Sequence, residues 1–122
     1  MKDCLPGKRV LVVEDDAALA YDMDDALRES GAQVVGPALD LPTGLQLARE
    51  HSLDGAVLDI DLCGEFVWPL AQELKRDSVP FVFVSADCGE GLPSDFQDST
   101  CLPKPAPTEH ILATVSQVIA SR

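Results

Sequence analysis

Short apolar runs alternate with amphipathic stretches along the whole chain. The runs have strand length, and the first is almost continuously apolar, as in a strand that is covered on both faces. The amphipathic stretches between them carry apolar residues at helical spacing. The pattern predicts strands at residues 9–13, 33–36, 55–60, 81–84 and 100–102, and helices at 17–30, 43–51, 66–75 and from 108 onward.

Local signals support several of these boundaries. Gly31 can end the first helix, Pro69 suits a first helical turn, and Thr108 is a candidate N-cap for the last helix. Residues 88–99 interrupt the alternation of strands and helices, because two glycines and a proline disfavour a full helix there. The alternation therefore predicts an α/β chain with five parallel strands, in which the fourth helix is replaced by a loop with at most one short turn.

Composition narrows the classes of protein. The chain has 122 residues, 46% of them hydrophobic and 25% charged, which is enough for one globular domain without a disulfide or metal. Its net charge of −12 disfavours nucleic acid and anionic membranes as partners and favours divalent cations or basic surfaces. The apolar stretch at 10–13 is too short for a signal peptide or a membrane span, so we expect a cytoplasmic protein.

The cysteines and histidines suggest no metal site of their own. The four cysteines form no C-x-x-C pair and the chain has two histidines, so zinc spacing is absent and free, reduced thiols are expected. His51 and His110 are interpreted as surface residues, and Trp68 as a packing residue of its helix rather than a partner anchor.

Candidate chemistry lies at the predicted strand ends. Ligands of an open parallel sheet bind outside the carboxyl ends of its strands. Each residue there has an ordinary interpretation: the acids at 14–16 could cap the next helix, Asp59 could be a turn residue, Ser85 a loop hydroxyl, and Lys104 could end a strand. Together they suggest more, because clustered carboxylates need a cation, an oxygen-rich cluster suits Mg²⁺, and a hydroxyl and an ammonium would complete a phosphoryl site.

Four short sequence motifs, in matching order and spacing, make the chain resemble a response-regulator receiver domain of two-component signalling. The motifs are Val-Val-Glu-Asp-Asp at 12–16, Val-Leu-Asp-Ile-Asp-Leu at 57–62, Phe-Val-Ser-Ala at 83–86 and Leu-Pro-Lys-Pro at 102–105. The resemblance covers the chain end to end and implies one receiver domain over residues 1–122, without an output domain. It implies a flavodoxin-like, doubly wound five-stranded sheet with strand order 2-1-3-4-5.

The resemblance also implies a role for each matching residue. Asp59 resembles the phosphoacceptor that takes a phosphoryl group from a histidine kinase or phosphotransfer protein. Glu14 and Asp15 resemble the Mg²⁺ ligands, with Asp59, and Asp61 resembles the position whose backbone carbonyl binds the metal. Ser85 resembles the hydroxyl that holds a phosphoryl oxygen. Lys104 resembles the lysine that pairs with the phosphate, and a cis bond to Pro105 is expected after it.

The chain departs from the family pattern at three positions next to these motifs. Cys101 stands where many receivers have a switch aromatic, and Cys63 stands where a proline is usual. The fourth strand resembles that of short stand-alone receivers reading Phe-Ala-Thr-Gly-Tyr, with Asp87 in place of the tyrosine. We therefore expect Asp87 to alter the lifetime of the acyl phosphate, and expect the output to differ from the common switch.

Two other function classes remain open on the sequence. Asp59-Ile60-Asp61 also resembles the D-x-D motif of haloacid-dehalogenase-like phosphatases, although that motif normally ends the first strand of its domain and two strand-like runs precede it here. A degenerate receiver that binds partners without phosphorylation is the other alternative. The favoured interpretation is a signalling module that catalyses only its own phosphorylation and slow dephosphorylation, and acts through protein contacts as a relay, a phosphate sink or a partner regulator.

Overall fold

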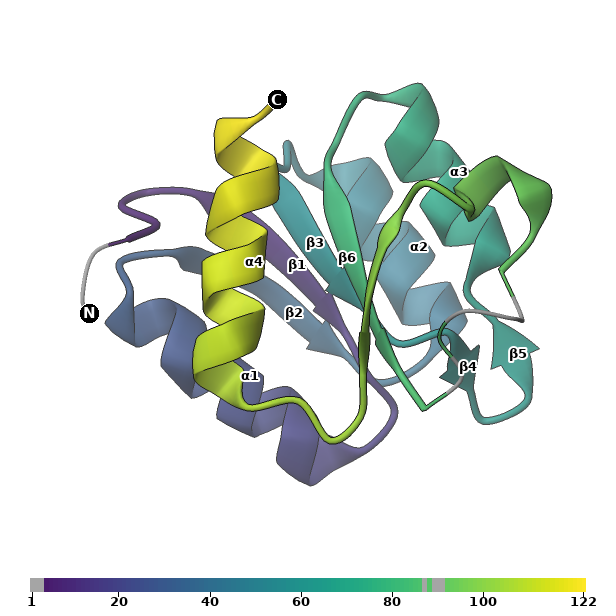
Figure 1. The fold of residues 1–122 in the computed structure, drawn as a ribbon, viewed down its shortest axis with the longest axis horizontal. Coiled ribbons are helices and arrows are strands. Elements are labelled where there is room, and N and C mark those ends of the chain that lie inside the picture. Colours follow the sequence, from purple (N-terminus) through teal and green to yellow (C-terminus); the bar gives the residue numbers. More distant parts are fainter. Residues whose placement is uncertain (1–3, 87, 89–91) are drawn as a thin grey trace.

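Five parallel strands form the central sheet of the protein, seen here in a computed structural model that describes residues 4–86, 88 and 92–122 (Figure 1). In those residues the sheet has the order β2-β1-β3-β6-β7. This is the predicted order 2-1-3-4-5, because a small hairpin takes the labels β4 and β5. The strands are β1 (Arg9–Val13), β2 (Gln33–Ala38), β3 (Gly55–Leu58), β6 (Phe81–Ser85) and β7 (Thr100–Pro103).

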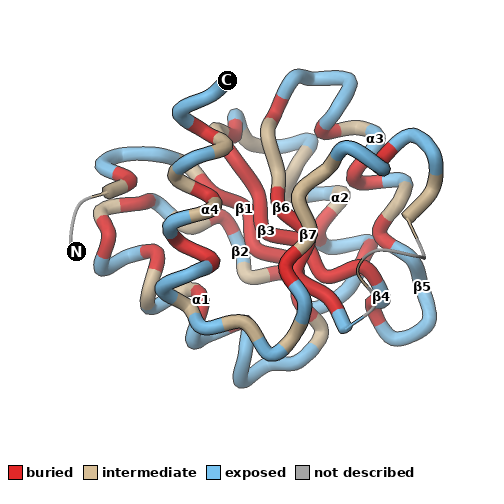
Figure 2. The backbone as a smooth tube through the Cα atoms, viewed as in Figure 1, coloured by how far each residue is buried: buried red, intermediate tan, exposed pale blue. Residues whose placement is uncertain are grey.

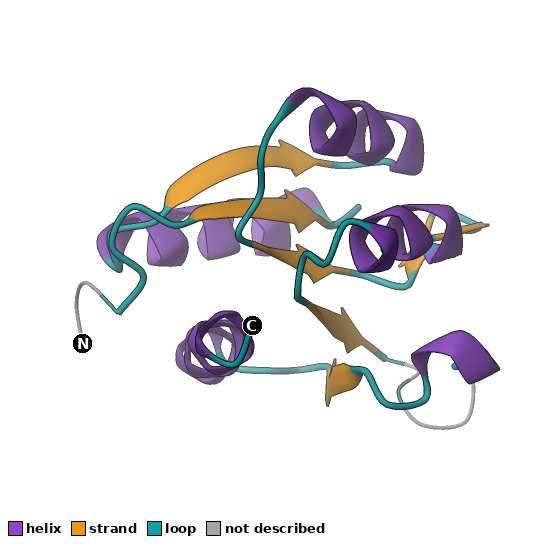
Figure 3. Ribbon diagram, turned by 90° about the horizontal axis from the view of Figure 1, so that it is seen from above, coloured by secondary structure: helices purple, strands orange, loops and turns teal. Residues whose placement is uncertain are grey.

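Helices cover both faces of this sheet, as right-handed crossovers require (Figure 3). One face carries α1 (Ala17–Glu29) and α4 (Thr108–Ala120), and the other carries α2 (Leu41–Glu50) and α3 (Trp68–Arg76). Among the described residues, no helix is both long enough and apolar enough to cross a membrane. The fold is the doubly wound α/β fold that the alternation of strands and helices predicts.

The hydrophobic core is divided into two layers by the sheet, and buried residues follow the strands through the centre (Figure 2). Side chains alternate along each strand, so Val10 and Val12 pack with Met23 and Leu27 of α1. Leu11 and Val13 face the opposite layer, where they join the α2 and α3 side chains. Both faces of β1 are therefore covered, which explains its continuous apolar run.

An aromatic cluster fills the layer where a fourth helix would otherwise pack. The described part of the segment between β6 and β7 contains a short 3₁₀ helix, η1 (Ser94–Phe96), in agreement with the predicted loop-like segment. Phe96 is fully buried and its ring lies 5.6 Å from that of Trp68 and 5.9 Å from that of Phe83. Trp68 is thus a packing residue, as predicted, and Phe96 supplies the apolar cover that a longer helix would give.

Several element boundaries differ from the prediction. The second helix begins at Leu41 rather than 43, because the Asp40 carboxylate accepts a hydrogen bond from the backbone N–H of Thr43 (2.8 Å) and Pro42 occupies the first turn. Thr108 is the first residue of α4 and not its cap; Pro107 precedes it without a side-chain cap.

Two further features of the backbone concern the predicted site. A short hairpin of β4 (Asp61–Leu62) and β5 (Glu65–Phe66), absent from the prediction, follows the third strand. The expected cis bond between Lys104 and Pro105 is present, and a second cis bond, not predicted, joins Gly36 to Pro37.

The prediction of free, reduced cysteines is wrong for half of them. Cys88 and Cys101 form a disulfide, whereas Cys4 and Cys63 are free. The prediction used sequence spacing, and these two cysteines are 13 positions apart. They meet because the chain returns beside β6 to form β7, so only the tertiary arrangement brings them together.

Candidate functional site

The carboxyl ends of four parallel strands bring the predicted site residues to one edge of the sheet. Glu14 follows β1, Asp59 follows β3, Ser85 ends β6 and Lys104 follows β7. All four come from the inner strands or the β7 edge next to them, and three of them (Glu14, Asp59 and Ser85) are buried. Residues that are up to 90 positions apart in sequence therefore converge as the strand-end argument predicts.

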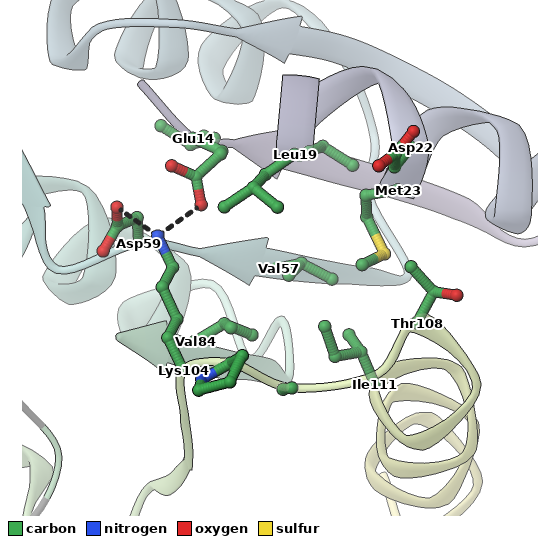
Figure 4. A pocket seen from close by; sticks show the side chains of 14 residues that line it. Glu14, Leu19, Asp22, Met23, Val57, Asp59, Val84, Lys104, Thr108 and Ile111 are labelled. Carbon is green, nitrogen blue, oxygen red and sulfur yellow. Dashed lines mark hydrogen bonds and ion pairs between the residues drawn. The ribbon is translucent and has the colours of Figure 1, made fainter. Parts of the chain in front are cut away.

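The ammonium of Lys104 lies between two carboxylates (Figure 4). Its Nζ is 2.9 Å from Oε1 of Glu14 and donates a hydrogen bond to Oδ2 of Asp59 at 3.1 Å. The side chains of Glu14 and Asp59 are 11% and 8% exposed and that of Lys104 is 23% exposed. The pair interactions are consequently shielded from water and stronger than those of surface ion pairs.

The three consecutive acids after β1 have three different environments. Glu14 points into the site, and its Oε2 accepts a hydrogen bond from the backbone N–H of Asp16 (3.0 Å). Asp15 accepts hydrogen bonds at one oxygen from the backbone N–H (3.0 Å) and the thiol (3.3 Å) of Cys63. Asp16 is exposed and caps α1 by accepting from the N–H groups of Ala18 and Leu19. The helix-cap interpretation thus holds for Asp16 alone.

Burial changes the protonation of Glu14 most. Desolvation raises the pKa of Glu14 from 4.5 to about 7, although its hydrogen bonds to the Asp16 backbone and to Lys104 oppose that rise. Burial likewise opposes the charge of Lys104, but its bonds to Glu14 and Asp59 outweigh this and raise the pKa of the lysine. Near neutral pH, then, Glu14 is poised between its two protonation states beside a permanent cation.

Asp15 differs from Glu14 in sign. Some burial opposes its charge, yet the hydrogen bonds from Cys63 and Glu14 lower the pKa of Asp15 below its usual value. The same contact with Asp15 raises the pKa of the Cys63 thiol. Cys63 therefore stabilises an ionised carboxylate at this edge, a contact that no spacing rule in the sequence reveals.

Three carboxylates gather closely enough to share a cation. Among the described residues, one oxygen from each of Glu14, Asp15 and Asp59 lies within 4.8 Å of the others. Such an oxygen donor set suits a hard divalent ion such as Mg²⁺. Asp61 is not part of this group; its exposed carboxylate accepts from the N–H of Gly64 in the β4–β5 hairpin (2.7 Å).

Ser85 is held in place by the β6–β7 ladder. It is 4% exposed, it pairs with Pro103, and its carbonyl oxygen accepts a hydrogen bond from the N–H of Lys104 (3.0 Å). This backbone bond ties the ends of the two strands that carry the predicted hydroxyl and ammonium. Asp87, which the sequence singles out two residues later, lies outside the described residues.

An apolar cavity of about 310 Å³ adjoins the Lys104 side chain (Figure 4). Its walls come mainly from the sheet, α1 and the segment that leads into α4. Leu19, Met23 and Ile111 line it, and Glu14, Asp59 and Lys104 close one end. Leu19 is 43% exposed, so apolar surface continues from the cavity onto α1. Sequence reasoning did not find this cavity, because helical spacing assigns its residues to an ordinary core.

Comparison with known proteins supports the resemblance to receiver domains. No family model matches the chain. The chain is 35% identical over 60 residues to the transcriptional regulatory protein PdtaR of Mycobacterium tuberculosis, a match that covers 49% of this chain and 29% of that protein. The non-phosphorylated HemR receiver domain of Leptospira biflexa is 28% identical with a TM-score of 0.80, covering 93% of this chain and 94% of that one.

A third match concerns the site. The receiver domain of the sensor histidine kinase PA1611 of Pseudomonas aeruginosa has the same fold, with a TM-score of 0.77 and 18% identity over 93% of this chain and 98% of that chain. Its crystal structure has a magnesium ion coordinated in the active-site cleft. The chain spans less than a third of the length of the curated regulators that it matches.

The doubly wound sheet carries acids after its first and third strands and a lysine after its last, as the resemblance to receiver domains implies. The chain is a receiver domain of the two-component response-regulator type. This class favours the receiver interpretation of the sequence over the phosphatase alternative.

Proposed function

We propose that this domain accepts a phosphoryl group on Asp59. The observation that carries the proposal is the position of the Asp59 carboxylate, held 3.1 Å from the Lys104 ammonium and within a three-carboxylate cluster at the end of β3. A nearly buried carboxylate beside a fixed cation is a nucleophile whose attack on phosphorus would not build up uncompensated charge.

The transfer uses an oxygen of Asp59 as nucleophile. That oxygen forms a bond to the phosphorus of a phosphohistidine, and the phosphorus–nitrogen bond breaks. The imidazole nitrogen leaves with the electron pair of that bond, and the product is an acyl phosphate on Asp59. Little covalent chemistry is left for other side chains, so positioning and charge neutralisation provide most of the rate.

Lys104 and Ser85 are proposed to hold the transferred group. The Lys104 ammonium already contacts Asp59 and can move its hydrogen bond from the carboxylate to a phosphoryl oxygen. Ser85 ends the neighbouring strand, from which its hydroxyl can donate to a second phosphoryl oxygen. The backbone hydrogen bond from the N–H of Lys104 to the carbonyl oxygen of Ser85 joins the two strand ends that carry these donors.

Mg²⁺ is the proposed cofactor, and its ligands would be Glu14, Asp15 and Asp59, with the backbone carbonyl of Asp61. The ion, when bound, neutralises negative charge on the phosphoryl group. Glu14 must lose its proton to serve as a ligand, which its pKa of about 7 allows near neutral pH. Coordination of magnesium in the PA1611 receiver, which has the same fold, supports this assignment.

The proposed partners are proteins. A sensor histidine kinase or a phosphotransfer protein would supply the phosphohistidine, and the apolar surface of Leu19 and the adjoining cavity lies next to the proposed acceptor. We propose that residues 1–122 work as one receiver domain in the cytoplasm, and that they catalyse only their own phosphorylation and its slow reversal. The signal would then pass to another protein by contact.

Intact-mass spectrometry tests this function. Wild type and Asp59→Asn are incubated with Mg²⁺ and phosphoramidate, and half of each sample is then treated with hydroxylamine. We expect one added phosphoryl group on wild type alone, removed by hydroxylamine, since that reagent cleaves acyl phosphates.

The other outcomes separate the alternatives. Release of free phosphate from the donor without an adduct would favour a phosphatase, which a generic phosphate ester would then confirm by steady turnover. An adduct on both proteins would remove Asp59 from the acceptor role. Neither adduct nor turnover would leave a binding module that works without phosphorylation.

A further inference from the structure

The disulfide joins the segment that follows Ser85 to the strand that precedes Lys104. Cys88 comes three residues after Ser85, and Cys101 comes three residues before Lys104. The Cα atoms of the two cysteines are 5.7 Å apart, and the sulfur of Cys88 lies 3.7 Å from the carbonyl oxygen of Ser85. That carbonyl oxygen is the one that accepts the N–H of Lys104. The bond thus fastens the two chain segments that position both proposed phosphoryl-binding side chains.

The two cysteines of the disulfide are partly exposed. Both cysteines are only partly buried, and Cys101 lies in β7, one of the two edge strands of the five-stranded sheet. A disulfide sulfur must be reachable by an attacking thiolate before it can be reduced. In a reducing compartment, disulfides that do form are usually transient and serve catalysis or redox sensing.

The strands do not depend on the disulfide for their pairing. β6 and β7 pair in register from Val82 with Thr100 to Ser85 with Pro103. The rings of Phe83 in β6 and Phe96 in η1, both fully buried, also pack against each other. Reduction is therefore expected to leave the sheet folded.

We propose that Cys88 and Cys101 form a reversible redox-modification site that takes a protein dithiol as its substrate and controls phosphorylation of Asp59. A thiolate of the dithiol attacks one sulfur, and the mixed disulfide is then resolved by the second thiol. Overall the Cys88–Cys101 bond breaks and takes up two electrons and two protons, while the dithiol becomes a disulfide.

The oxidised form restrains phosphorylation for a steric reason. A phosphoryl group on Asp59 must be accommodated between Ser85 and Lys104, so the segments carrying them have to adjust. The disulfide joins these segments 13 positions apart in sequence and removes much of that freedom. The dithiol form can make the adjustment, so it should accept phosphoryl groups faster. This inference rests on the proposed phosphorylation of Asp59.

The test compares phosphorylation rates in the two redox states. Protein is oxidised or reduced with dithiothreitol, the reductant is removed, and the disulfide is verified by alkylation and peptide mass mapping. Each form then receives Mg²⁺ and phosphoramidate, and intact mass follows the adduct with time. We expect the dithiol form to react faster by about fivefold or more, within the usual range of coupling between sites.

Two variants sharpen the test. Cys88→Ser/Cys101→Ser should react at the rate of the dithiol form whatever the redox treatment. Cys4→Ser, which alters a free cysteine outside both sites, should keep the redox difference.

Each result has a distinct meaning. Equal rates in the two forms, a faster oxidised form, or failure of Cys88 and Cys101 to pair would overturn the redox proposal while leaving phosphorylation of Asp59 intact. No adduct in either form would remove the proposed function and this inference with it.

Discussion

The two ends of the sheet carry the same kinds of charged groups in opposite settings. At the carboxyl end, Lys104 lies between Glu14 and Asp59, whose side chains are 11% and 8% exposed. At the amino end, Arg49 forms hydrogen bonds with Glu73, and their side chains are 62% and 19% exposed; Arg122 pairs with Asp54 there, with side chains 41% and 34% exposed. Water screens the second set and reaches the first set poorly.

This difference in solvent exposure separates a site that can do chemistry from ordinary surface ion pairs. Burial raises the pKa of Glu14 to about 7, so its charge depends on pH, on Lys104 and on any bound cation. Glu73 is shifted the other way, because the hydrogen bond from Arg49 lowers its pKa. The acid–base pairs look alike as residue types, and their exposure decides which of them can take part in phosphoryl chemistry.

Removal of Lys104 should have the largest effect on stability. Lys104→Met leaves Glu14 and Asp59 buried beside each other, so we expect a loss of about 3 kcal/mol in the free energy of unfolding at alkaline pH. Urea unfolding without divalent cations measures it. Lys8→Met, at an exposed lysine, is the matched control, expected to shift stability by less than about 0.5 kcal/mol. Equal losses in the two variants would contradict the role of burial.

Glu14 and Glu73 should respond to pH with opposite signs. A carboxyl whose pKa is raised on folding binds its proton more tightly in the native state, so its contribution to stability falls as pH rises from 4.5 to about 7. In cation-free buffer, the free energy of unfolding of Glu14→Gln should therefore rise relative to that of wild type across this pH range, by about 2 kcal/mol.

Glu73→Gln is the matched comparison for this pH effect. The lowered pKa of Glu73 means that its contribution is present above its unfolded pKa and is lost as pH falls. The free energy of unfolding of Glu73→Gln should thus fall relative to that of wild type as pH rises. This change should be smaller than that for Glu14→Gln, because the Arg49–Glu73 pair is exposed to solvent. Parallel pH curves for the two variants would show that burial does not distinguish them.

Asp16 should behave as a helix cap and not as part of the site. Asp16→Ala removes the acceptor for the N–H groups of Ala18 and Leu19, which should cost about 1 kcal/mol in thermal or urea unfolding. Asp16→Asn keeps a capping oxygen and should stay close to wild type. If Asp16→Asn lost as much as Asp16→Ala, the charge rather than the cap would be responsible.

The exposed pair should give the smallest effect. Arg49→Gln breaks both hydrogen bonds to Glu73, but solvent replaces them, so we expect the free energy of unfolding to fall by less than about 0.5 kcal/mol at physiological salt. A shift comparable to that of Asp16→Ala would mean that exposed pairs matter here as much as local capping does.

Much of the site was predictable because strand ends carry it. Apolar runs locate the strands, and parallel strands place the residues that follow them at one edge. Periodicity and residue type are therefore enough to group Glu14, Asp59, Ser85 and Lys104. The β4–β5 hairpin was missed, since strands of two residues leave no periodic signal. The contact between Cys63 and Asp15 depends on that hairpin and was missed with it.

The cysteine pair was missed for a different reason. Cys101 can be placed beside Phe83 once the order of the strands is known, but Cys88 belongs to an irregular segment whose path no periodicity describes. Spacing rules apply to motifs that close locally, and this bond closes through the sheet.

The sequence by itself determined the α/β class, the order of the elements, the short segment in place of a fourth helix and the strand-end residues. These follow from periodicity and from residue types, which are local properties. Tertiary structure alone decided which of three consecutive acids caps a helix and which enters the site, how far burial raises the pKa of Glu14, and that Cys88 meets Cys101. Burial, dielectric and distant contacts depend on the packed arrangement of the whole chain, so no local pattern encodes them.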